Sequence, residues 1–131
     1  MITNDPTVDC TSGDILRGAN NKNIKGAGLP HFIIYLGPRP NSEHEFLGAM
    51  LTTSDKQPEN IPMKPEHFKE KDKDGNPYSV TYKNSKVVAK LYVKKMDWRP
   101  FELKGQLTEE GLTFVTKLTD GMNPEYYHGN L

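Results

Sequence analysis

The chain of 131 residues has little of several features that would assign a class of protein at once. Its only cysteine, Cys10, cannot form an internal disulfide, which is typical of the reducing cytoplasm. No segment approaches the roughly 18 consecutive apolar residues of a membrane-spanning helix. The N-terminus also lacks the basic and apolar regions of a secretory signal. The sequence therefore predicts one small soluble protein in the cytoplasm, away from the membrane.

Net charge is absent as well, because 17 Lys and Arg balance 17 Asp and Glu. This balance excludes the overall positive field that draws many proteins to nucleic acid. The charge is nevertheless uneven: residues 64–104 hold 11 basic and 6 acidic side chains, whereas both flanking segments are net acidic. Such a basic segment can bind phosphate groups, but lysines that alternate with apolar residues are also typical of solvent-facing strands. The sequence leaves both interpretations open.

An apolar content of 34%, with 11 Gly and 10 Pro, predicts short strands separated by turns. The β-branched, aromatic and small apolar runs predict strands at 14–17, 31–36, 46–51, 78–82 and 86–93. Residues 55–75 are expected to form an extended connection with a half turn near 66–69, and residues 74–77 a tight turn. The last strand has a period of two, which predicts one buried face and one solvent-facing face. The buried set is Val87, Ala89, Leu91 and Val93, and the outward set is Lys86, Val88, Lys90, Tyr92 and Lys94.

One helix is predicted near the C-terminus. Thr108 is a good N-cap, and Glu109 and Glu110 follow in the first turn, where the helix dipole favours negative charge. Its apolar stripe is Leu112, Val115 and Leu118, and Gly121 with Pro124 ends it. The fold class is therefore mainly β, a small curled sheet or barrel with a C-terminal helix packed against it. We expect a flexible N-terminal tail at 1–12, a single domain at 13–121 and a C-terminal tail at 122–131.

Most chemical motifs are missing. The four histidines lie in four different segments, without the paired spacing of a zinc site. No phosphate-binding GxxxxGK[ST] loop and no GxSxG nucleophile turn occurs. The sequence thus predicts neither a metal nor a cofactor.

Hydroxyl groups and one imidazole remain at predicted strand ends. His31 begins one strand, and Thr52, Thr53 and Ser54 end the next. If these strands are antiparallel neighbours, the start of one lies near the end of the other. Together with a nearby cation, such groups can move a proton and stabilise a pentacoordinate phosphate. The alternative is structural, since strand-end Thr and Ser commonly bond backbone groups.

The order of the segments resembles a known family. A GDI start at 13–15 and a long Gly-containing loop precede a Pro-led apolar strand at 30–35 and a strand that ends in LTTS at 51–54. The stretches 84–97 and 104–110 then supply a strand, a turn with basic residues and aspartate, and a GxL segment that leads into the helix. Over about residues 13–118 the chain is similar to the PemK/MazF toxins, small ribonucleases of bacterial toxin–antitoxin systems.

The resemblance implies an SH3-like barrel, a homodimer and an antitoxin protein that covers the RNA groove. It also implies metal-independent cleavage of single-stranded RNA, in which the ribose 2′-hydroxyl attacks the adjacent phosphate. The family uses a threonine or serine at the end of the strand that follows the Pro-led strand. Thr52 matches that position, with Thr53 beside it. It also uses an arginine before the strand's proline, where this chain has Leu29. The candidates to replace that arginine are His31, Lys25 and Arg17.

The leading hypothesis is therefore a toxin-like endoribonuclease. His31, Thr52 and Thr53 are its expected catalytic residues, and Arg17, Lys25 and Ser54 its expected RNA-binding residues. A second hypothesis is a catalytically inactive SH3-like module that binds a protein or RNA partner, which the missing arginine and the zero net charge favour. A third is an accessory protein of a mobile element whose barrel is purely structural.

Overall fold

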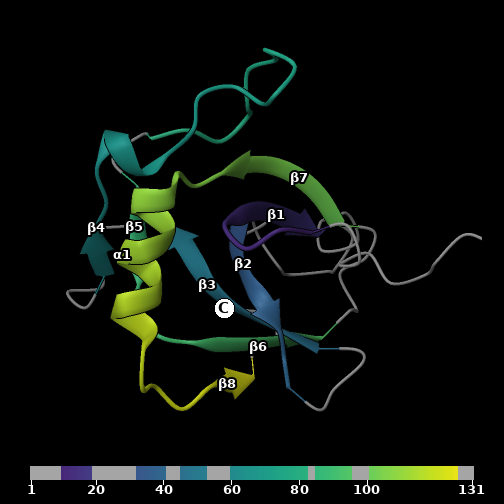
Figure 1. The fold of residues 1–131 in the computed structure, drawn as a ribbon. Coiled ribbons are helices and arrows are strands. Elements are labelled where there is room, and N and C mark those ends of the chain that lie inside the picture. Colours follow the sequence, from purple (N-terminus) through teal and green to yellow (C-terminus); the bar gives the residue numbers. More distant parts are fainter. Residues whose placement is uncertain are drawn as a thin grey trace, which may run out of the picture.

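The computed structural model describes residues 10–18, 32–40, 45–52, 60–82, 85–95 and 101–126. This part of the chain is mainly β with one α-helix near its C-terminal end, which confirms the predicted fold class at that level (Figure 1). The strands are β1 (Asp14–Gly18), β2 (Phe32–Pro38), β3 (Glu45–Thr52), β4 (Asn60–Pro62), β5 (Lys86–Val88), β6 (Tyr92–Lys95), β7 (Phe101–Gln106) and β8 (Glu125–Tyr126). The helices are the 3₁₀ turn η2 (Pro65–His67) and α1 (Glu109–Thr119). Neither helix is long and apolar enough to cross a membrane.

The strands form one open sheet in the order β4-β5-β3-β2-β1-β7. These neighbours are antiparallel, and β6 also pairs antiparallel with β3. The short β8 then pairs parallel with β6. The long strand β3 thus has two partners on the same side, with Leu51 opposite Val87 of β5 and Gly48 opposite Tyr92 of β6.

The prediction of a single strand over 86–93 is therefore wrong. The chain turns between β5 and β6, where the Lys90 N–H donates to the Val88 carbonyl oxygen at 2.8 Å. The expected outward face is also wrong in part, because Tyr92 is buried and Lys94 is only 1% exposed. A period of two predicts a solvent-facing side only where one face of the sheet meets solvent. Here both faces carry buried clusters.

Two apolar clusters account for this double burial, one on each face of the sheet. Neighbouring residues of a strand enter different clusters, as strand alternation requires. The cluster on the α1 side contains Ile15, Ile34, Ala49, Leu51, Met63, Phe68, Val87, Leu107 and Val115. The cluster on the other side contains Leu16, Ile33, Tyr35, Phe46, Met50 and Tyr92. The unbroken apolar runs of β2 and β3 follow from burial on both faces.

Helix α1 begins as predicted, with the Gly111 N–H donating to Thr108 Oγ1 at 3.1 Å. Gly111 is required for packing, because an added Cβ would overlap the backbone of His67 in η2. The His67 ring is buried and stacks on Phe114 with a centroid distance of 4.7 Å, while its Nδ1 accepts the Lys64 N–H. This histidine therefore joins α1 to η2.

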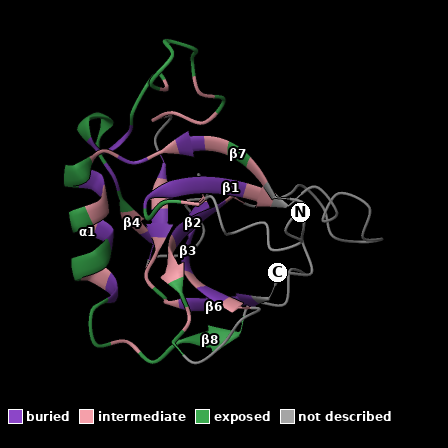
Figure 2. Cartoon of the chain, turned by 45° about the vertical axis from the view of Figure 1, so that its right-hand side comes forward, coloured by how far each residue is buried: buried purple, intermediate pink, exposed green. Residues whose placement is uncertain are grey.

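The prediction of a strand over 78–82 is wrong. Residues 68–82 instead form a long loop beside β7, joined to it by hydrogen bonds from the Lys69 N–H to the Gln106 oxygen and from the Val80 N–H to the Lys104 oxygen. These isolated bonds are too few to form a ladder. The loop projects from the sheet and is largely exposed (Figures 1 and 2). Its tip is the predicted turn, in which Asp72 Oδ1 accepts the N–H groups of Asp74 and Asn76.

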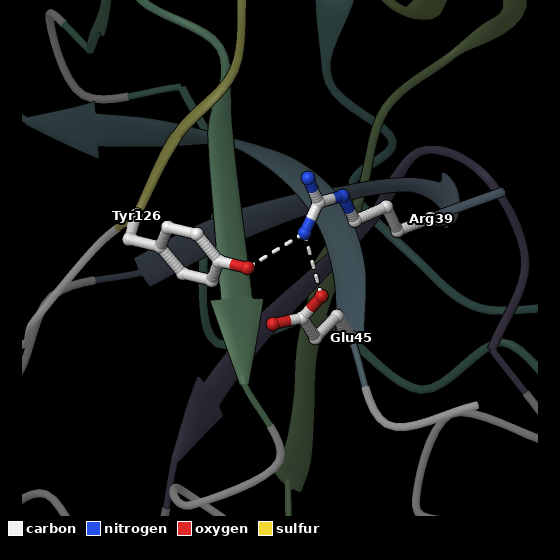
Figure 3. Close-up of polar contacts among 3 residues, drawn as sticks. All are labelled: Arg39, Glu45 and Tyr126. Atoms are coloured by element: carbon white, nitrogen blue, oxygen red, sulfur yellow. Dashed lines mark hydrogen bonds and ion pairs between the residues drawn. The ribbon is translucent and has the colours of Figure 1, made fainter. Parts of the chain in front are cut away.

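Parts of both predicted tails pack on the sheet. Ser12 donates its hydroxyl hydrogen bond to the Leu36 carbonyl oxygen. At the other end, Arg39 Nη1 donates to Glu45 Oε1 and to the Tyr126 hydroxyl oxygen, both at 2.7 Å (Figure 3). The Arg39 guanidinium also lies 5.4 Å from the centre of the Tyr126 ring. Strand β8 is thereby fastened to the β2–β3 hairpin.

Candidate functional site

Six strands meet at one end of the sheet, where β1, β3 and β4 end and β2, β5 and β7 begin. The register places Phe32 opposite Leu51, so the expectation that the start of β2 lies beside the end of β3 is confirmed. Arg17 is opposite Glu102 on the other side of β1. We call this part of the molecule the strand-end region, defined by Arg17, Phe32, Thr52, Lys86 and Glu102.

Thr52 is the last residue of β3 and lies opposite Lys86, the first residue of β5. Both side chains are half-buried. Residues directly opposed in antiparallel strands have Cβ atoms about 4.5–5.5 Å apart and share a face of the sheet. The register therefore places Thr52 and Lys86 side by side on one face of the sheet at the strand end.

Arg17 is the other predicted site residue that the structure describes. Its Nε atom is buried and has no hydrogen-bond partner. The opposed Glu102 carboxylate does not form an ion pair with it and instead lies 3.2 Å from Lys104 Nζ. The Arg17 guanidinium thus has no counter-ion among the residues in the described ranges.

Arg17 and Thr52 do not share a face. Strand alternation from Ile15 places Arg17 on the α1 side, whereas Thr52 follows Met50 onto the opposite side. The two strands are separated only by β2, so their backbones are about 10 Å apart at the neighbour spacing of about 4.8 Å. Both side chains can therefore contact an extended ligand that crosses the end of the sheet, but not one small group.

The other predicted site residues lie outside the described residues. These are His31, Thr53, Ser54 and Lys25, together with Leu29 at the position of the family's arginine. Within the described ranges, no group of His, Cys, Asp and Glu is arranged to hold a metal ion.

No protein-family model and no curated protein matches this chain. The function must therefore be inferred from the residues of the strand-end region and from the resemblance in segment order.

The described residues suit phosphate binding better than proton transfer. Arginine and lysine are the usual partners of phosphate oxygens, and a threonine hydroxyl can donate a further hydrogen bond. The residue predicted to transfer a proton, His31, lies outside the described residues.

Sequence reasoning missed Lys86, which was assigned to a solvent-facing stripe. Its pairing with Thr52 joins strands that are more than 30 positions apart in the chain. Local periodicity carries no information on such a pairing. The available signal was the position of Lys86 at the start of a predicted strand, equivalent to that of His31.

Proposed function

We propose that the protein binds single-stranded RNA at the strand-end region and cleaves it without a metal, as a toxin-like endoribonuclease of the PemK/MazF type. The proposal includes an SH3-like closure of the curled sheet. The observation that carries it is the Arg17 guanidinium, which has no counter-ion among the described residues and whose Nε is buried without a hydrogen-bond partner. A buried donor without an acceptor costs free energy of folding, about 1–3 kcal/mol or more for a charged group. A phosphate bound by the terminal Nη groups would give this guanidinium charge-assisted hydrogen bonds.

The proposed reaction is internal transfer of the phosphodiester. The ribose 2′-hydroxyl attacks the adjacent phosphorus, the bond to the 5′-oxygen breaks, and the products are a 2′,3′-cyclic phosphate and a 5′-hydroxyl. Lys86 would neutralise the charge that builds up on the phosphate oxygens, and Thr52 would donate a hydrogen bond to one of them. Arg17, on the other face, would bind a neighbouring phosphate of the same RNA strand. His31 would take the proton from the 2′-hydroxyl or give one to the leaving oxygen.

The resemblance also supports two protein partners. We propose that the chain forms a homodimer and that an antitoxin protein covers the strand-end region in the cytoplasm. An antitoxin with an acidic segment would compete with RNA for Arg17 and Lys86.

The experiment is a gel assay of labelled single-stranded RNA in the presence of EDTA. We expect product from the unaltered protein and at least tenfold less from Arg17→Gln, Thr52→Ala and His31→Ala, since one lost charge-assisted hydrogen bond is worth about that factor. Lys117→Gln on the exposed side of α1 is the matched control and should cleave normally. Failure of the unaltered protein to cut or bind RNA would overturn the proposal.

The second candidate function is binding without cleavage. It is favoured by Leu29, which stands where the family has its arginine, because leucine can neither hold a phosphate nor donate a proton. In the same gel this function gives a shifted RNA band without product. The Arg17→Gln variant would then abolish the shift rather than the cleavage.

A further inference from the structure

A cavity of about 450 Å³ lies between the 69–78 loop and the adjoining parts of β1 and β7. It is separate from the strand-end region, because Asp14 begins β1 and Arg17 lies near its end. The volume is within the range of about 300–1,000 Å³ that is usual for small-molecule pockets. We call it the loop pocket.

The floor of the loop pocket is a continuous hydrogen-bond chain. The Asp14 carboxylate is 5% exposed and accepts the Thr11 N–H at 2.9 Å and Gln106 Nε2 at 2.8 Å. Gln106 Oε1 in turn accepts from Lys69 Nζ at 2.8 Å. These bonds fix the orientation of the Gln106 amide, so the floor is organised before any ligand arrives.

The walls combine cations with flat or apolar side chains. Lys71 and Lys73 line the pocket, and in the described ranges neither ammonium group has a hydrogen-bond or ion-pair partner. Leu103 also lines it and is 54% exposed, although it is a large apolar residue. Tyr78 completes the wall, and its pKa is raised by burial and by the negative charges of Asp72 and Asp14. Its hydroxyl therefore remains a hydrogen-bond donor at neutral pH.

We infer that the loop pocket binds one nucleotide unit of the RNA, an assignment that rests on the proposed function for the source of that nucleotide. The base would pack on Leu103 and Tyr78, since stacking on aromatic side chains is the common way in which single-stranded bases are held. Its phosphate would lie against Lys71 and Lys73. The polar floor formed by Gln106 and Asp14 would meet the hydrogen-bonding edge of the base.

Two other ligand classes fit the lining less well. A purely apolar ligand would leave the ammonium groups of Lys71 and Lys73 without an anionic partner. An acidic peptide would bring several carboxylates close to Asp14, Asp72 and Asp74, which also line the pocket, and would offer no planar ring to Leu103 and Tyr78. A nucleotide supplies both one anionic group and a planar ring with donors and acceptors.

The test is calorimetric titration of the full chain with nucleoside 5′-monophosphates and, separately, with a short 2′-O-methyl oligonucleotide that cannot be cleaved. The variants are Leu103→Ser and the double variant Lys71→Gln/Lys73→Gln. Lys90→Gln/Lys117→Gln is the control. Both residues are exposed and lie outside the pocket, and the two substitutions remove the same charge as the pocket variant. We expect each pocket variant to lower the affinity for both ligands about tenfold, the factor typical of a lost stacking or charged contact. The control should change the affinity less than twofold.

The outcomes separate this inference from the proposed function. The inference would be overturned if the pocket and control variants changed the nucleotide affinity equally. It would also be overturned if the unaltered protein bound no nucleotide. If the unaltered protein cleaves RNA while the pocket variants bind and cleave normally, the inference fails and the proposed function stands. If the pocket binds nucleotides as described but RNA is neither cleaved nor bound at Arg17, the inference stands and the proposed function fails.

Discussion

Arg17 and Glu102 occupy directly opposed positions of β1 and β7 without forming an ion pair. The Glu102 carboxylate contacts Lys104 instead, and the buried Nε of Arg17 has no acceptor. Opposite charges placed in this way usually stabilise a strand pair. Arg17 is therefore a cation at the end of the sheet without a counter-ion among the described residues, and the proposed function assigns it a phosphate.

Replacement of Arg17 by methionine should therefore separate stability from function. The variant removes the unpaired donor and keeps an unbranched side chain, so we expect its free energy of unfolding to equal or exceed that of the unaltered protein by up to about 1 kcal/mol. RNA affinity should fall at least tenfold. Urea unfolding and gel shift measure the two quantities. A loss of more than about 2 kcal/mol in stability would instead make Arg17 a structural residue.

Substitutions of Thr52 should distinguish its hydroxyl from its methyl group. Thr52→Ser keeps the donor and should retain RNA cleavage within a few-fold, whereas Thr52→Ala and Thr52→Val should reduce it by 10²-fold or so, the effect of removing one donor to a developing charge. Single-turnover cleavage rates provide the comparison. Equal rates for the serine and valine variants would show that the hydroxyl has no part in the reaction.

Gly111→Ala should destabilise the fold. The added methyl group would overlap the backbone of His67, so α1 must move away from η2. This shift would also pull Val115 of α1 out of its apolar cluster. Forced overlap of this kind costs about 1–3 kcal/mol. Thr113→Ala, at an exposed position of the same helix, is the control and should change stability by less than about 0.5 kcal/mol. A Gly111 variant as stable as this control would contradict the described packing of α1.

Stability should fall in strong alkali through Tyr92. Burial, and secondarily the charge of Glu125, raises the pKa of Tyr92 above its ordinary value. The folded state thus holds the phenolic proton more tightly than the unfolded state, so its contribution is complete below the unfolded pKa of about 10 and is lost as the pH rises through the folded pKa. Urea unfolding of Tyr92→Phe at pH 8 and pH 11 should show a smaller alkaline loss than the unaltered protein. An identical loss in both proteins would assign the effect to other groups.

The amino-acid sequence predicts the elements whose signals are local. The N-cap at Thr108, the turn around Gly75 and the strands at 14–17 and 46–51 depend on neighbouring residues, and each is present. The strand at 31–36 is also present, although its start at His31 lies outside the described residues. Local signals were sufficient because capping, positive φ and apolar runs act over a few residues.

The predictions from sequence fail where tertiary contacts determine the structure. The buried position of Lys94 and the turn between β5 and β6 depend on the two-sided core and on β3, which pairs with both strands. The Thr52–Lys86 pair has the same origin, because no local pattern specifies which strands become neighbours. The antiparallel placement of β2 and β3 could be anticipated since the two strands are consecutive.

The most direct measurement is the fate of a labelled single-stranded RNA incubated with the unaltered protein and with Arg17→Gln in the presence of EDTA. The proposed function predicts fragments that end in a 2′,3′-cyclic phosphate for the unaltered protein, and at least tenfold less product for the variant. Intact and unshifted RNA with the unaltered protein, or equal cleavage by both proteins, would contradict it.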